Sequence, residues 1–157
     1  MIRTTPERQI HFPVLSITRD KCVAQYKDEL ELTTAIGKKS SSGRTLPGYL
    51  GMKIIDQDGN LFEVREAILG RDLGSLYPRL SLSRFLFRTR RMEANLGLAA
   101  LGKISLDETK HLVADLLPSV RRSLAAAGFD AESLPASVNS AVGFQQLFSL
   151  LDPRQTH

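Results

Sequence analysis

The sequence predicts one α+β domain, in which a small antiparallel sheet from residues 11–69 packs against three or four helices from residues 79–152. Short runs rich in β-branched and aromatic residues, separated by turn residues, fill the first part of the chain. Apolar residues three and four positions apart dominate the second part. With 157 residues, the chain has about the commonest domain size and can bury a core without metals or disulfides.

Strands are expected at residues 11–17, HFPVLSI, and again from Cys22 to Tyr26. The second strand leads into a short helix or a further strand near Leu30. Residues 37–48, GKKSSSGRTLPG, have the composition of a loop, because they are rich in glycine, serine and cations. Such a loop is either mobile or a binding loop.

A β-hairpin is predicted in residues 52–64, MKIIDQDGNLFEV. Two apolar-rich runs flank Asp58-Gly59, and this dipeptide tolerates the positive φ angles of a tight turn. Phe62 and Val64 alternate with Leu61 and Glu63, so they share one face of the second strand. We expect this face to meet the core.

The next element is expected to be a helix that begins at Ser81 or Ser83 and ends at about Leu101. The apolar stripe along one face of this helix consists of Leu82, Phe85, Leu86, Thr89, Met92 and Leu96. The opposite face carries Arg84, Arg88 and Arg91. We therefore expect the apolar residues to be buried and the three arginines to be exposed.

The helix after it has the clearest start signal in the chain. Ser105 and Glu108 form a capping box, in which each side chain bonds the backbone N–H of the other residue. Pro118 predicts a break or kink, since proline lacks the N–H that a helix interior needs. Gly128 suits the C-terminal end. A last amphipathic helix is expected over residues 138–151.

Positive charge is concentrated in residues 79–91, RLSLSRFLFRTRR, within a chain of net charge +4. This stretch has five arginines and no acidic residue, and arginine suits bidentate contacts to carboxylate or phosphate. With the cations of the 37–48 loop, the candidate partner-binding residues are Arg84, Arg88, Arg90, Arg91, Lys38, Lys39 and Arg44. The alternative interpretation is a solvated helix face without a partner.

These cations fit an acidic protein surface or the phosphates of a nucleic acid. A binder of single strands also needs exposed aromatic residues for stacking, but aromatics make up only 6% of the chain and tryptophan is absent. We therefore predict a non-enzymatic protein-binding module. The alternative is an accessory nucleic-acid-binding protein that uses the arginine-rich helix face 79–91.

Patterns for catalysis and metal binding are incomplete. Three residues spaced by four fall on one predicted helix face, namely Asp107, His111 and Asp115. Ligands in a row on one straight helix do not converge on an ion. Residues 56–59 match the start of a calcium loop, but the twelfth position is Ala67 instead of glutamate. Cys22 and His11 lack a third residue that would orient the base. We expect no enzyme activity, no cofactor and no metal.

The predicted location is the cytoplasm. The N-terminal residues contain no apolar stretch of roughly 7–15 residues, which a signal peptide needs. Nowhere does the chain approach the roughly 18 apolar residues of a membrane span. The single cysteine, Cys22, excludes an intramolecular disulfide and suits a reducing compartment.

The order of FPVLSI, a poorly alternating segment and GYLGMKIIDQDGNLFEV resembles small bacterial α+β proteins of the toxin-immunity type. The resemblance covers residues 12–64, about a third of the chain. It implies a cytoplasmic protein that binds and neutralises one partner toxin, and it assigns no binding residue. Because this chain is basic, such a partner would have an acidic surface or would not act on nucleic acid.

Overall fold

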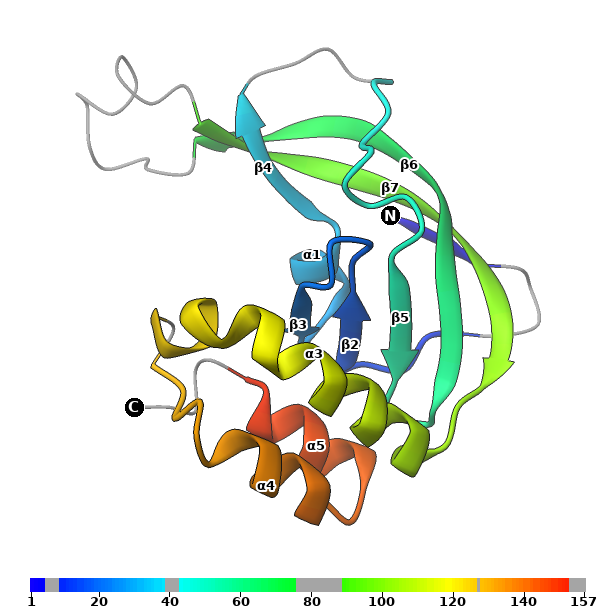
Figure 1. Ribbon diagram of the computed structural model, residues 1–157. Coiled ribbons are helices and arrows are strands. Elements are labelled where there is room, and N and C mark those ends of the chain that lie inside the picture. Colours follow the sequence, from blue (N-terminus) through cyan, green and yellow to red (C-terminus); the bar gives the residue numbers. More distant parts are fainter. Residues whose placement is uncertain (5–8, 39–42, 76–88, 127, 153–157) are drawn as a thin grey trace.

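The computed structural model describes residues 1–4, 9–38, 43–75, 89–126 and 128–152 (Figure 1). Seven strands form one curled sheet in these ranges, in the spatial order β1-β7-β6-β5-β2-β3, and β4 also pairs with β7. The strands are β1 (Ile2–Thr4), β2 (Val14–Ile17), β3 (Val23–Tyr26), β4 (Thr34–Lys38), β5 (Lys53–Asp56), β6 (Asn60–Ser75) and β7 (Thr89–Lys103). The helices are α1 (Glu29–Leu32), α3 (Leu106–Ala126), α4 (Leu134–Ser140) and α5 (Phe144–Leu150).

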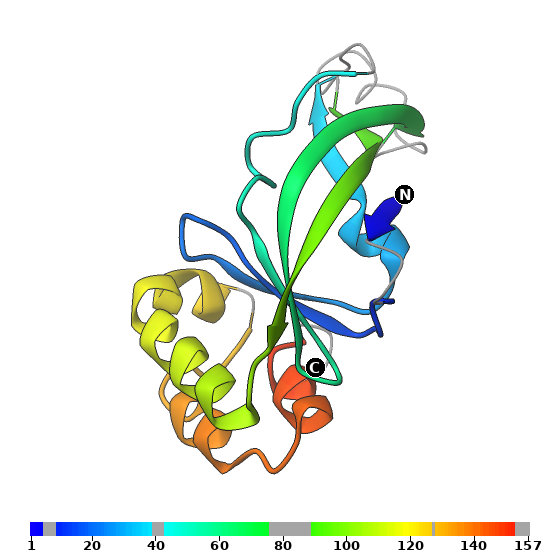
Figure 2. The same cartoon turned by 90° about the vertical axis from the view of Figure 1, so that its right-hand side faces the viewer.

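A long antiparallel hairpin of β6 and β7 curves across the whole sheet (Figure 1). The two strands have sixteen and fifteen residues, and their register shifts at four places. A register shift of this kind bends a strand and increases its twist. The hairpin therefore curls over, and α3, α4 and α5 gather at the opposite end of the sheet (Figure 2).

The α+β class is confirmed, but the predicted helix is wrong wherever the structure describes it, because residues 89–103 form β7. Met92 and Leu96 lie four residues apart, so they share a face in a helix and also in a strand. Ala94 and Leu98 are buried with them, which is the period of two that a strand requires. The strand-forming region consequently extends well beyond residues 11–69.

The sheet has a core on each face at β2, where all four residues are buried. Val14 points into the core enclosed by the curled sheet, together with Ile54, Phe62 and Val64. The predicted burial of Phe62 and Val64 is thereby confirmed. On the other face, the residues of the sheet that pack against α3, α4 and α5 are Leu15, Ile17 and Ile55. The fourth helix, α1, lies within the strand-forming part, between β3 and β4.

The hairpin predicted around Asp58-Gly59 is confirmed. β5 and β6 pair antiparallel, with Ile54 opposite Phe62, and Gly59 has a φ of +75°. The turn also contacts the end of β7, because the Ile104 N–H donates to the Gly59 carbonyl oxygen at 2.9 Å. The turn is thus part of the junction between the sheet and α3.

The capping box of α3 is confirmed in both directions. The backbone N–H of Glu108 donates to Ser105 Oγ at 3.2 Å, and Ser105 N–H donates to Glu108 Oε2 at 2.9 Å. The hydroxyl of Ser105 also donates to this carboxylate and lowers the pKa of Glu108. Local sequence chemistry therefore sets the first turn of the helix.

The course of α3 and the number of C-terminal helices differ from the prediction. α3 continues through Pro118, whose side chain is exposed, so the predicted break is wrong. Buried Leu116 and Leu117 anchor this part of α3 in the core, and tertiary packing outweighs helix propensity. The single last helix is also wrong, since α4 and α5 are separated at residues 141–143, where Val142 is 89% exposed. Within the described residues, no helix has the length and apolar character needed to span a membrane.

The turn at Gly59 gives a direct test of the fold. A Cβ at this position would lie 2.7 Å from the Ile104 carbonyl oxygen, and the positive φ disfavours any L side chain. Gly59→Ala should therefore lower the free energy of unfolding, measured by urea denaturation, by about 2 kcal/mol. Gly48→Ala is the matched control, because no heavy atom lies within 4 Å of its added Cβ. Equal stability of the two variants would contradict this description of the turn.

Candidate functional site

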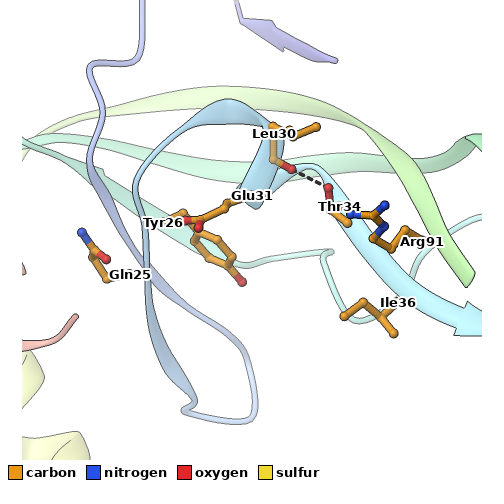
Figure 3. Close-up of a pocket in the computed structure, with 7 residues that line it drawn as sticks. All are labelled: Gln25, Tyr26, Leu30, Glu31, Thr34, Ile36 and Arg91. Atoms are coloured by element: carbon orange, nitrogen blue, oxygen red, sulfur yellow. Dashed lines mark hydrogen bonds between the residues drawn. The ribbon is translucent and has the colours of Figure 1, made fainter. Parts of the chain in front are cut away.

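A hollow of about 530 Å³ lies where β3, α1 and β4 approach β7 (Figure 3). The side chains that line it are Gln25, Tyr26, Leu30, Glu31, Thr34, Ile36 and Arg91. Six of these seven residues come from one continuous stretch of chain, and Arg91 comes from β7. A short segment therefore builds most of the site.

The single turn of α1 shapes this stretch. Asp28 caps the turn by accepting the Glu31 N–H at 2.8 Å, and Thr33 N–H donates to the Glu29 carbonyl at 2.9 Å. Thr34 Oγ1 then donates to the Leu30 carbonyl at 2.6 Å. These bonds hold the turn between β3 and β4. The two strands lie at opposite ends of the sheet, and the curl of the sheet brings both ends to the hollow.

Two large apolar side chains are exposed in this hollow. Leu30 is 67% exposed and Ile36 is 63% exposed, whereas their neighbours Leu32 and Ala35 face the core. A single exposed apolar residue is ordinary on a protein surface, but two in one hollow form an apolar patch that a partner can cover. Sequence reasoning missed both residues, because no local pattern in this part of the chain marks which apolar side chains face solvent.

Charge at the hollow is uneven. Arg91 lies directly opposite Ile36 in the pairing of β4 with β7, and its side chain is exposed. No ion pair with Arg91 forms among the side chains that the structure describes. The Glu31 carboxylate is held by Lys27. The backbone N–H of Lys27 donates to Glu31 Oε2 at 2.9 Å, and the Lys27 ammonium lies 3.5 Å from Glu31 Oε1. The site therefore offers an exposed positive charge beside apolar side chains.

The tyrosines near the hollow stay neutral. Burial raises the pKa of Tyr26, and the hydroxyl of Ser16 lowers it by less. Burial also raises the pKa of Tyr49 to about 12, with a further increase from Tyr26. Both phenols are protonated at neutral pH, so neither supplies a negative charge that would compete for Arg91.

The predicted partner-binding cations do not form one cluster in the described structure. Arg90 and Arg91 point to opposite faces of β7, and Arg90 Nε lies 2.6 Å from Asp72 Oδ2. Arg44 is exposed, and its carbonyl accepts the Leu69 N–H at 2.7 Å, so this part of the predicted loop runs along β6. Lys38 is the last residue of β4. The candidates outside the described residues are Arg84, Arg88 and Lys39.

A second group of polar residues lies at the β5–β6 turn. Candidate ligand atoms of His11, Asp56 and Asp58 lie within 4.8 Å of one another. The buried Asp56 carboxylate already accepts four N–H groups, from the backbones of Asp58, Asn60 and His11 and from the Asn60 amide, at 2.8–3.3 Å. Its acceptor capacity is therefore used. Asp58 pairs with His11 Nδ1, so the group fastens residue 11 to the turn.

Comparisons with known proteins identify no relative of this chain. No family model, no curated protein and no solved structure matches the chain. The resemblance to proteins of the toxin-immunity type stays a prediction. The hollow offers apolar contact, one exposed guanidinium, neutral hydroxyl and amide groups, and a Glu31 carboxylate that Lys27 already holds.

The contact between His11 and Asp58 is testable by titration. The hydrogen bond to the Asp58 carboxylate raises the pKa of His11 above 6.5. The pair therefore stabilises the fold below about pH 6.5, and this stabilisation is lost as the pH rises through the folded-state pKa. NMR titration of His11 should show the raised pKa, and Asp58→Asn should lower it. Asp20→Asn, at an exposed carboxylate in another turn, should leave it unchanged. A pKa that is the same in all three proteins would contradict this pairing.

Proposed function

We propose that this protein is a non-enzymatic protein-binding module, and that its partner docks in the hollow between β3, α1 and β4. The observation that carries the proposal is the exposure of Leu30 and Ile36 in one hollow beside Arg91, which has no described counter-charge. Of the titratable groups there, Glu31 is already held by Lys27, which favours binding over acid–base chemistry.

The energetics suit a specific contact. Complete burial of a leucine or isoleucine side chain contributes roughly 1.5–3 kcal/mol, and Leu30 and Ile36 retain about two thirds of this surface for a partner. Arginine is enriched among the residues that dominate binding energy, and a complementary charge speeds association. The fitting partner is a protein surface with an apolar side chain next to a carboxylate.

Charge pairing along the hairpin favours a protein partner over a nucleic acid. Arg65 lies 3.2 Å from Glu63, Arg71 lies 3.1 Å from Glu93, and Arg90 is paired with Asp72. The positive charge of these arginines is already partly compensated by carboxylates of the chain itself. The exposed Arg91 is flanked by apolar residues. The most specific form of the proposal is neutralisation of a partner toxin with an acidic surface, as the sequence resemblance implies.

A peptide selection tests this proposal. A phage library of random twelve-residue peptides is panned against the immobilised full chain, and affinities of the enriched peptides are measured by isothermal titration calorimetry. Leu30→Asp should weaken binding by about tenfold or more, since it places a desolvated charge in the apolar patch. Val142→Asp is the matched control, because it makes the same kind of change at an 89% exposed site in the α4–α5 link.

Both variants should keep the stability of the parent chain within about 0.5 kcal/mol, because both sites are exposed. Failure to enrich any peptide above an uncoated surface would contradict the proposal. Peptides that bind Leu30→Asp as tightly as the parent chain would also contradict it, since the hollow would then not be the binding site.

A further inference from the structure

We propose that the partner contributes an extended acidic segment, which adds to the sheet as a new strand along the outer edge of β4. This inference rests on the proposed function and specifies how the hollow is occupied. Strand addition uses main-chain hydrogen bonds for affinity and neighbouring side-chain sites for specificity. Both requirements are met at β4.

The first requirement is an open sheet edge. The Ala94 N–H donates to the Thr33 carbonyl at 2.7 Å. With the strand register, this bond identifies which residues of β4 bond to β7 and which point away from it. Because the bonding direction alternates along an antiparallel strand, Ala35 bonds to β7 while the N–H and C=O of Thr34 and Ile36 point outward. Among the described residues, β7 is the one strand that pairs with β4, so no described strand occupies these outward groups.

The second requirement is a side-chain site beside that edge. Thr34 and Ile36 project from the same face of β4, and both line the hollow with Leu30 (Figure 3). A guest strand would lie about 4.8 Å from β4, so its residue opposite Ile36 would contact this side chain directly. Alternate side chains of the guest would then face the apolar patch.

Charge identifies the guest. Arg91 pairs with Ile36 on β7, so a guest residue opposite Ile36 lies two strand spacings, or about 10 Å, from the Arg91 backbone. An arginine and a glutamate side chain can bridge this distance across Ile36. Glu93, which shares this face, lies 3.1 Å from Arg71, so its charge is already compensated. The structure therefore favours a carboxylate on the guest strand.

A second copy of this chain fits less well. In a pairing of β4 with β4 of another copy, the residues next to Ile36 would come from β4, which has no acidic residue. Arg91 would then remain without a carboxylate partner on the guest strand. The acidic segment of a different protein satisfies the same backbone groups and also compensates Arg91.

The decisive variant is Ile36→Pro, measured with peptides selected on the parent chain. Proline removes the outward N–H but no bond to β7, and sheets tolerate proline on an edge strand. Ile36→Ala is the matched control, because it removes apolar surface and keeps the N–H. Affinity should be about tenfold lower for the proline variant than for the alanine variant. Arg91→Gln should also weaken binding about tenfold and reduce its dependence on salt.

Independently of any variant, NMR of the parent complex should show cross-strand contacts between the peptide backbone and the amides of Thr34 and Ile36. The enriched peptides should also contain acidic residues. Equal affinity of the proline and alanine variants, or the absence of these contacts, would overturn strand addition. Leu30→Asp would still report on the hollow itself, so failure of strand addition is distinguishable from failure of the proposed function. A dimer of the chain in sedimentation analysis that peptide does not dissociate would also overturn the inference.

Discussion

The curl of the β6–β7 hairpin determines how the other strands, the core and the hollow are arranged. Two paired strands of sixteen and fifteen residues bend together through four register shifts, and every other strand joins this hairpin directly or through β5. The bend lets the sheet enclose a core around Phe62 and Leu96. It also brings β3 and β4, from opposite ends of the sheet, to the two sides of α1. The hollow is therefore a consequence of sheet curvature.

Burial on the opposite face keeps this geometry in place. Leu15 and Ile55 pack against α3, α4 and α5, so the centre of the sheet is covered on both sides. The β5–β6 turn links the two layers through the bond between Gly59 and Ile104. The helices cover this end of the sheet, and the interaction surface that we propose lies at the other end, where β4 pairs with β7. The proposed binding site thus lies on a strand whose inner edge pairs with β7 and whose outer edge pairs with no described strand.

Sequence reasoning succeeded where the determining contacts are local. The Asp58-Gly59 turn and the capping box of α3 depend on neighbouring residues, and both were predictable. β7 was not, because the four-residue spacing of Met92 and Leu96 satisfies a helix and a strand equally. The hollow depends on the register between Ile36 and Arg91, which lie far apart in the chain. No local pattern reports that register.

Amide hydrogen exchange of the free chain tests whether the outer edge of β4 is open, because it reports which backbone groups of the strand are bonded. Protection of the amides should alternate along the strand. The Ala35 amide should exchange slowly because it bonds to β7, while the amides of Thr34 and Ile36 should exchange rapidly at the open edge. Equal and strong protection at all three residues would show that the outer edge is already paired, and it would contradict strand addition at β4.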